Sequence, residues 1–265
     1  MGIFWAVIMV AGIGLFFGAG LAIASMVMES PPCDRRIDEI TKVLSGTNCG
    51  GCGYAGCEAY AIAVVQDGAA CNVCYPGGEE AAAAISGIMG VETIPAEKLA
   101  AQVCCCGTAD NCPDIYAYAG EQTCAAAAML YSGPKDCDFG CLGYGDCIRA
   151  CPFGSIELEN GIANVMEIPC RACKVCVKSC PKGIIKIVNV DETTKKAAVL
   201  CRNTDPGGIC RKQCKASCVG CKVCQKACHL GAIQVKDNIA VVDQEKCDGC
   251  GKCALMCPRK CIELK

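Results

Sequence analysis

The sequence predicts an α+β protein that consists of a single N-terminal transmembrane helix, a small helical domain and two tandem, related modules. Three observations predict it: a long apolar stretch at the N-terminus, 31 cysteines among 265 residues, and a cysteine pattern that recurs after 77 residues. Cysteine at this density exceeds the roughly 8–10% that marks a special scaffold, and only 5 Phe, 7 Tyr and 1 Trp accompany it. We therefore expect several small modules, each organised around its cysteines.

Charge and histidine content exclude several classes of function. The formal net charge is −2 and no long basic run occurs, so the chain lacks the electrostatic footprint of a nucleic-acid-binding protein. A single histidine excludes His-rich metal sites and most Ser–His or Cys–His catalysis. Disulfides, zinc and iron–sulfur clusters are the uses of cysteine that remain.

Residues 3–28 form an uncharged apolar stretch that, as a helix, is long enough to span roughly 30 Å of hydrocarbon. A cleaved signal peptide is disfavoured, because no basic residue precedes the stretch and the stretch is too long. Arg35, Arg36 and Lys42 follow it, so the positive-inside rule places the body of the protein in the cytoplasm. We expect residues 1–28 to be a single-pass anchor in the cell membrane, and a reducing cytoplasm disfavours disulfides.

Residues 29–78 are expected to contain a connector and a first iron–sulfur domain. The cysteines of this domain follow the pattern C-x2-C-x4-C-x16-C and are Cys49, Cys52, Cys57 and Cys74. Zinc sites typically pair two C-x2-C knuckles, whereas the expected set contains one, Cys49 and Cys52. Closely spaced glycines let the backbone approach a bulky cluster. The pattern therefore predicts a [4Fe–4S] site beside a short helix over residues 58–66.

An alanine-rich linker is expected over residues 79–132. Its first part, residues 79–101, has Pro95 near the middle and is expected to form a helix, a turn and a second helix. Five cysteines follow at positions 104, 105, 106, 112 and 124. Their spacing matches no standard motif, so their role stays open.

Two modules, residues 133–190 and 191–265, each contain a pair of cysteine runs of the bacterial ferredoxin type, C-x2-C-x2-C-x3-C-P. The runs that begin at Cys170 and Cys247 are complete, and each ends in proline. Short β-type segments between the runs predict a hairpin in each module. Metal ligation would stabilise modules with so small an aromatic core.

The other two runs depart from the pattern. The run that begins at Cys218 has His229 in place of the proline, and the run that begins at Cys141 has Tyr144 in place of the second cysteine. Cys137, four residues before Cys141, is the expected substitute ligand.

In two-cluster ferredoxins the fourth cysteine of each run binds the other cluster, so each module is expected to hold two clusters. In the first module the expected ligand sets are Cys137, Cys141, Cys147 and Cys180, and Cys151, Cys170, Cys173 and Cys176. In the second module they are Cys218, Cys221, Cys224 and Cys257, and Cys228, Cys247, Cys250 and Cys253. These sites offer no open coordination position beside an acid or a base, so we expect one-electron transfer and assign no catalytic residue.

Eleven cysteines remain after these five sites. One or two further clusters are compatible with them, and so are buried free thiols. The candidates for further ligands are Cys105, Cys112, Cys124, Cys201, Cys210 and Cys214. We therefore expect at least five [4Fe–4S] clusters and allow six or seven; a further cluster that takes Cys137 would change the first module's ligand set.

Three features of the chain together resemble one known family. They are the apolar N-terminal stretch, the group at 49–78 that closes on Cys-x-Pro-Gly-Gly, and Gly-Pro-Lys-Asp-Cys-Asp-Phe-Gly-Cys-Leu-Gly-Tyr-Gly-Asp-Cys-Ile-Arg-Ala-Cys-Pro-Phe-Gly at 133–154. These motifs resemble the B subunit of the Rnf complex, and the second module resembles the longer, cluster-rich versions found in anaerobic bacteria.

The resemblance implies a membrane complex that passes electrons from reduced ferredoxin to NAD⁺ while it pumps Na⁺ or H⁺. In that complex this chain would be the iron–sulfur relay, with the flavins, the nicotinamide site and the ion path on partner subunits. The chain agrees in lacking a G-x-G-x-x-G fingerprint after a strand, so no flavin or NAD is expected on it. Soluble ferredoxin is expected to dock on the ferredoxin-like modules, with electrons running to the 49–74 site.

Two alternatives stay open at this point. A membrane-anchored polyferredoxin could serve a hydrogenase or another reductase without ion pumping. A zinc or disulfide scaffold without redox activity is the alternative from another class of protein.

Overall fold

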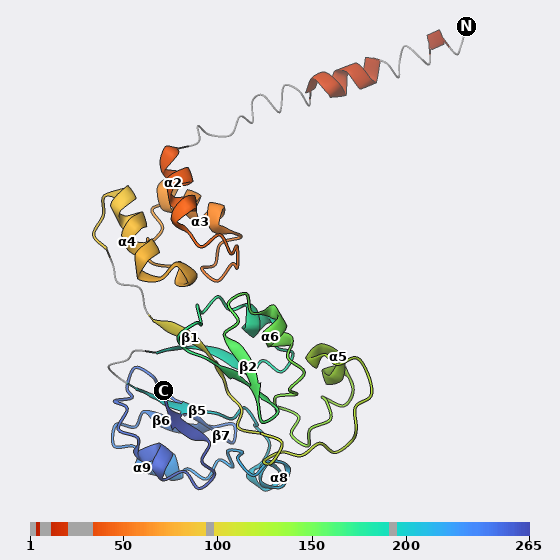
Figure 1. Ribbon diagram of the computed structural model, residues 1–265, viewed down its shortest axis with the longest axis vertical. Coiled ribbons are helices and arrows are strands. Elements are labelled where there is room, and N and C mark those ends of the chain that lie inside the picture. The colour runs from red at the N-terminus through yellow and green to blue at the C-terminus, as the bar shows by residue number, and fades with distance from the viewer. Residues whose placement is uncertain (1–3, 6–11, 21–33, 94–97, 191–194) are drawn as a thin grey trace.

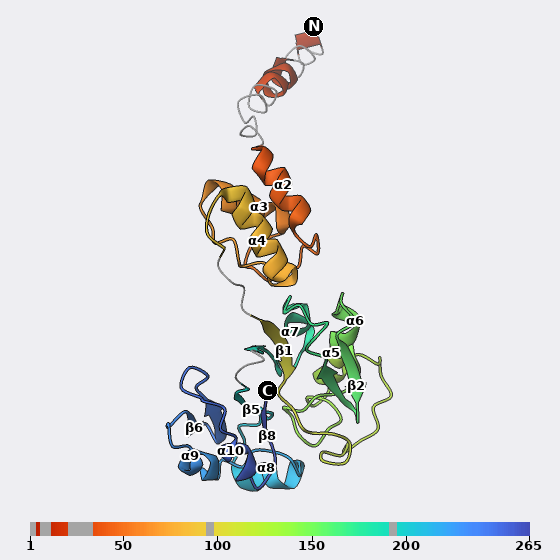
Figure 2. The same cartoon turned by 60° about the vertical axis from the view of Figure 1, so that its left-hand side comes forward.

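The computed structural model describes residues 4–5, 12–20, 34–93, 98–190 and 195–265. Figures 1 and 2 show three bodies that follow one another along the long axis of the molecule: a helical domain and two modules that contain strands. The helical domain lies between the N-terminal residues and the first module, and the second module holds the C-terminus. The order of the bodies in space thus repeats their order in the sequence.

Three helices and a short 3-10 turn build the helical domain. They are α2 (Arg35–Val43), α3 (Cys57–Gln66), η1 (Tyr75–Gly77) and α4 (Gly78–Met89). Asp34 caps α2, because its carboxylate accepts the backbone N–H of Arg36 at 3.0 Å. Ile40, Tyr60 and Ile85 are almost wholly buried in one core, so α4 belongs to this domain and not to the predicted linker that begins at residue 79.

The linker region does not form the expected second helix. After α4, the strand β1 (Leu99–Val103) pairs antiparallel with β4 (Ile185–Asn189). The pairing satisfies backbone groups along both strands that would otherwise lack partners. Local sequence could not reveal it, because the partner strand lies more than 80 residues further along the chain.

The first module surrounds a small hairpin. Its remaining elements are α5 (Cys124–Met129), α6 (Asp146–Ala150), β2 (Ile156–Glu159), β3 (Ile162–Val165) and α7 (Val175–Ser179). β2 and β3 pair antiparallel, as expected, and the turn residues Asn160 and Gly161 have φ values of +49° and +78°. Ile156, Val165 and Ile184 form its core together with cysteines.

The second module repeats this plan. Its elements are β5 (Ala197–Val199), α8 (Gly207–Gln213), α9 (Val223–Ala227), β6 (Ile233–Lys236), β7 (Ile239–Val242), α10 (Lys252–Leu255) and β8 (Ile262–Leu264). The expected hairpin is present as β6 and β7, and β5 pairs with β8 as β1 pairs with β4. The repeat of 77 residues relates Ile185 to Ile262, but their partners Val103 and Val199 are 96 residues apart.

The predicted single N-terminal transmembrane helix is overturned. Within the described part of the chain, no helix is long and apolar enough to cross a membrane. Within the predicted span, residues 4–5 and 12–20 are described, and both stretches are helical. Residues 3, 6–11 and 21–28 of the predicted span lie outside the described residues. The single-pass anchor, and the cytoplasmic placement that rested on it, are therefore not supported.

Candidate metal centres

Every cysteine in the described part of the chain is a free thiol, and the cysteines gather in groups in all three bodies. The helical domain carries the first group. Cys52, Cys57 and Cys74 pack together in its core. Burial raises the pKa of the Cys74 thiol, and the nearby sulfurs of Cys57 and Cys52 raise it further. Asn48 accepts the backbone N–H of Cys57 at 2.8 Å and so fixes the start of α3 at this expected ligand.

The first module brings together Cys151, Cys170, Cys173 and Cys176. Burial raises the pKa of Cys176 to about 11, and the neighbouring sulfurs of the other three cysteines add to the shift. Two backbone amides point at the sulfurs: Ala101 N–H donates to Cys170 Sγ at 3.3 Å, and Ser155 N–H donates to Cys151 Sγ at 3.4 Å. Such N–H···S bonds stabilise the thiolate form of cysteine over the thiol and shift the reduction potential of a bound cluster.

Cys124 takes part in the other group of the first module, in the place expected for Cys137. A pocket there is lined by Cys124, Cys141, Cys147 and Cys180, whereas Cys137 faces a different pocket. Burial raises the pKa of Cys147 to about 12, and the sulfurs of Cys141, Cys124 and Cys180 contribute. The structure therefore places four cysteines around one pocket, and the spacing of the run that contains Tyr144 does not predict this set.

The Asp146 carboxylate positions Cys124. Its two oxygens accept the backbone N–H groups of Cys124 and Ala125, both at 2.9 Å. Because Asp146 begins α6 directly before Cys147, one carboxylate holds two candidate ligands that are 23 positions apart in the sequence. The sequence contains only a weak signal for this pairing. Thr123 caps an alanine-rich helix that begins at Cys124, but the tertiary fold decides which other cysteines lie beside Cys124.

The second module brings together both of its expected sets. Cys228, Cys247, Cys250 and Cys253 line one pocket. Burial raises the pKa of Cys224 to about 11, and the sulfurs of Cys218, Cys221 and Cys257 contribute to the shift. Sequence reasoning missed Cys261, which is 1% exposed and whose sulfur lies 3.7 Å from Cys257 Sγ. His229 lies on the surface of this module, with Nε2 3.4 Å from the Asp248 carboxylate.

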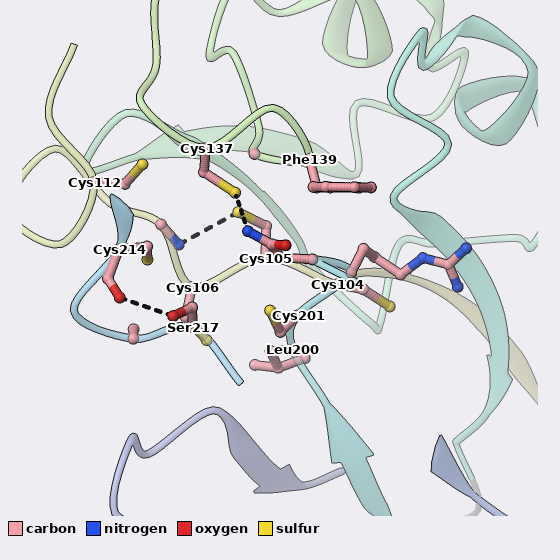
Figure 3. A pocket seen from close by; sticks show the side chains of 15 residues that line it. Cys104, Cys105, Cys106, Cys112, Cys137, Phe139, Leu200, Cys201, Cys214 and Ser217 are labelled. Carbon is pink, nitrogen blue, oxygen red and sulfur yellow. Dashed lines mark hydrogen bonds between the residues drawn. The ribbon is translucent and has the colours of Figure 1, made fainter. Parts of the chain in front are cut away.

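Seven cysteines line a pocket between the two modules (Figure 3). They are Cys104, Cys105, Cys106, Cys112, Cys137, Cys201 and Cys214. Four of the candidate extra ligands therefore converge here, whereas Cys124 lies in the first module. Cys210 is buried beside this region, and its thiol donates to Asp205 O at 3.2 Å. Cys71 lies in the helical domain, and Cys33 lies outside the described residues.

The helical domain and the first module meet at their cysteine groups. Lys174 Nζ donates to the carbonyl oxygen of Gly51 at 2.9 Å and lies 5.3 Å from the centre of the Tyr75 ring. A Cβ added to Gly51 would lie 3.1 Å from Cys173 O, so only glycine fits comfortably at this approach. The cysteine group of the helical domain therefore adjoins the group of the first module that contains Cys173.

The donor chemistry of these groups fits [4Fe–4S] clusters. Thiolate sulfur is the soft donor that iron–sulfur clusters use. The sulfurs are collected in fours, most are partly or wholly buried, and backbone amides donate to several of them.

Two known protein families match parts of the chain. Residues 44–76 match the family described as "Putative Fe-S cluster", and residues 240–263 match the "4Fe-4S binding domain". The first match includes all four expected ligands of the helical domain and ends two residues after Cys74. Both matches support iron–sulfur binding.

Curated relatives cover nearly the whole chain. The B subunit of the Na⁺-translocating ferredoxin:NAD⁺ oxidoreductase complex of Acetobacterium woodii is 44% identical over 250 residues, which cover 94% of this chain and 74% of the relative. The B subunit of the ion-translocating oxidoreductase complex of Methanosarcina acetivorans is 41% identical over 263 residues, 98% of this chain and 97% of the relative. The corresponding B subunit of the proton-translocating complex of Clostridium ljungdahlii is 38% identical, over 95% of this chain and 88% of the relative. The chain therefore belongs to the B-subunit family of the ion-translocating Rnf-type oxidoreductase complexes.

Proposed function

We propose that this chain relays electrons one at a time from reduced ferredoxin to the partner subunits of an ion-translocating ferredoxin:NAD⁺ oxidoreductase complex. The observation that carries the proposal is the succession of cysteine groups from the second module, through the first, to the helical domain. The names of the relatives support ferredoxin as donor and NAD⁺ as final acceptor.

A bound [4Fe–4S] cluster would supply each group with a reversible one-electron redox centre. The residues of this chain hold that centre and set its potential. Thiolates bind the iron, amides such as Ala101 N–H lower the electron density on sulfur, and buried aliphatic residues such as Ile184 keep water away. NAD⁺ takes up two electrons and a proton, so two single electrons must be combined on a partner subunit.

The second module is the proposed place of electron entry. Cys221 and Cys250 are the exposed cysteines among the described residues, and a site near the surface is within reach of a docked donor. Leu255 and Met256 nearby in the chain are 87% and 57% exposed, and α9 carries the exposed Lys226. An exposed apolar patch with basic side chains suits an acidic electron-carrier protein.

The helical domain is the proposed place of electron exit within this chain. It lies at the opposite end of the body from the second module (Figures 1 and 2). The contact between Lys174 and Gly51 holds its cysteine group against that of the first module. Electrons that enter at the second module would then have to cross both modules before they reach the partner subunits.

The test compares two cysteine substitutions in the helical domain of the assembled complex. Cys52→Ala removes an expected ligand, and Cys71→Ala removes a cysteine of the same core that belongs to no expected set. With Cys52→Ala, reduced ferredoxin should still bleach the remaining clusters of this chain, but NAD⁺ reduction should fall to background. Cys71→Ala should leave both unchanged. Full NAD⁺ reduction with Cys52→Ala would contradict the proposed route.

A further inference from the structure

We propose that Cys105, Cys112, Cys137 and Cys214 form a further four-thiolate site, which binds one [4Fe–4S] cluster between the two modules. Three ligands come from the first module and its preceding loop, and one comes from the second module. No matched family covers these residues, and the ferredoxin runs do not predict their association.

Three of the four cysteines lie around Gly107, and Cys137 packs against two of them. A Cβ added to Gly107 would lie 3.3 Å from Cys105 Sγ, 3.4 Å from Cys112 Cβ and 3.9 Å from Cys214 Sγ. Cys112, Cys137 and Cys214 pack together and are 1%, 7% and 5% exposed. Figure 3 shows the sulfurs of Cys105 and Cys137 beside each other, on the side of the pocket where Cys112 and Cys214 lie.

The backbone fixes this convergence across the boundary between the modules. The N–H of Lys215, next to Cys214, donates to the carbonyl oxygen of Asn111, next to Cys112, at 2.8 Å. The side chains of Cys112 and Cys214 pack against each other. The backbone segments that carry Cys112 and Cys214 are thus paired, and this pairing brings the two cysteines into contact.

Hydrogen-bond donors point at the sulfurs, as they do around thiolate ligands. The backbone N–H groups of Gly107 and Cys141 donate to Cys105 Sγ at 3.3 and 3.4 Å. The side-chain amide of Asn203 donates to Cys137 Sγ at 3.4 Å. Asn203 is 0% exposed, and Asp205 N–H donates to its carbonyl oxygen at 2.7 Å, which fixes the amide with its nitrogen toward the sulfur.

Two cationic side chains flank the site. Lys135 is 6% exposed, and its ammonium group donates to the carbonyl oxygen of Gly107. The Arg259 guanidinium donates to the carbonyl oxygen of Cys214 at 2.7 Å. A buried ammonium group is costly unless an anion compensates it. A cluster bound by four thiolates carries net negative charge and would provide that compensation.

The other cysteines of the pocket are oriented differently. Cys201 Sγ accepts the N–H of Cys218 at 3.4 Å and so faces the second module. Figure 3 shows the sulfur of Cys104 directed away from Cys112 and Cys214, and the sulfur of Cys106 lower in the pocket beside Cys201. Cys104 and Cys106 are therefore suitable control positions.

The proposed site would connect the two modules for electron transfer. Cys141 belongs to the pocket of Cys124, Cys147 and Cys180, and its N–H contacts Cys105 Sγ. The proposed site thus touches a predicted site of the first module while Cys214 ties it to the second. Metal ligation across the boundary would also fix the modules to each other.

The experiment counts iron and acid-labile sulfide in the full chain, reconstituted without oxygen. Cys112→Ala and Cys214→Ala should each remove about four irons, the content of one cluster. The double substitution should remove the same four, because both residues serve one cluster. Cys104→Ala and Cys106→Ala should remove none. Additive losses in the double variant, or equal losses in the control variants, would overturn the proposal.

A substitution outside the four cysteines provides a second, independent measurement. Asn203→Leu keeps all four thiols and removes the amide N–H that points at Cys137. It should preserve the iron content and lower the midpoint potential of one cluster in an EPR-monitored titration, because the reduced cluster loses a donor. Unchanged potentials for every cluster would count against the site even if the cysteine variants failed to fold. Both measurements concern cluster binding at this site. Either result could therefore contradict the site while the proposed ferredoxin-dependent NAD⁺ reduction is still observed.

Discussion

Lys174 of the first module donates a hydrogen bond to the carbonyl oxygen of Gly51 in the helical domain, across 123 positions of sequence and over 2.9 Å. Lys174 has a left-handed backbone, with φ of +64°, directly before α7. Cysteine groups of the two bodies flank this bond, and the sulfur of Cys49 is near enough to raise the pKa of Cys173. On the proposed route, the bond therefore lies at the boundary that an electron would cross to enter the helical domain.

Lys174→Met should slow electron transfer across that boundary about tenfold, since the loss of a charge-assisted hydrogen bond costs roughly 1.5–3 kcal/mol when fully expressed and this contact is partly solvated. Flash photoreduction measures the rate within the chain and is independent of ferredoxin docking. Lys222→Met is the matched control, because Lys222 has a φ of +61° before α9 in the second module. An equal effect of both substitutions would contradict the assigned role of Lys174.

Cys124→Ala should remove about four irons, the content of one cluster, because Cys124 shares a pocket with Cys141, Cys147 and Cys180. Adding Cys147→Ala should cause no further loss, whereas adding Cys112→Ala should remove about four more. Iron and sulfide analysis of the three variants is the measurement. If Cys124→Ala leaves the iron content unchanged, Cys124 is not a ligand.

Asp146→Asn should weaken the first module. The two oxygens of the Asp146 carboxylate accept two backbone N–H groups at the start of α5, and the single amide oxygen of asparagine would replace only one of them; a hydrogen bond to a charged group contributes roughly 1.5–3 kcal/mol. We expect a lower midpoint of thermal unfolding and faster iron loss to a chelator. Glu157→Gln on the exposed face of β2 changes charge equally and should have little effect. Equal destabilisation by the two substitutions would indicate that the loss of negative charge, and not the loss of a hydrogen bond at the start of α5, lowers the stability.

Gly107→Ala should disturb the site between the modules, because the added methyl group would lie 3.3 Å from Cys105 Sγ. The expected results are a lower iron content or a shifted midpoint potential for one cluster, read by iron analysis and EPR. Gly87→Ala, within α4, meets nothing within 4 Å of the new Cβ and should be neutral or slightly stabilising. A Gly107 variant with wild-type iron content and potentials would be evidence that the space around Gly107 holds no cluster.

Cluster assembly should become more favourable as pH rises from about 7 to about 9. Burial raises the pKa of Cys147 to about 12 and that of Cys176 to about 11, so in the cluster-free protein these thiols carry protons at neutral pH. Iron binds thiolate, and assembly must therefore release those protons. Proton release during anaerobic iron and sulfide uptake, measured at several pH values, tests this. Uptake that is independent of pH would contradict it.

The sequence predicts best what lies close together along the chain. The cysteines at 228, 247, 250 and 253 line one pocket, as their spacing predicts, and both hairpins occur where short β-type segments flank turn residues. A run of four closely spaced cysteines leaves few alternative partners, so local spacing carries most of the information.

Contacts between distant segments were not predictable. Cys124 reaches Cys141 and Cys147 because Asp146 binds its helix start, and Cys112 meets Cys214 because two loops pair across the module boundary. Neither contact produces a periodic pattern in the sequence. The strand β1 was missed for the same reason, since its alanine-rich sequence favours a helix until β4 offers a partner. For the apolar N-terminal stretch, composition predicted a membrane span, and the described residues contain no helix that could provide one.

The pairing of β1 with β4 also determines how far the helical domain can separate from its neighbour. Because β1 is fixed in the first module, nine residues, 90–98, separate α4 from that anchoring point. Even fully extended, a connection of this length reaches only roughly 35 Å. The contact of Lys174 with Gly51 therefore forms between two bodies that their own chain already keeps close.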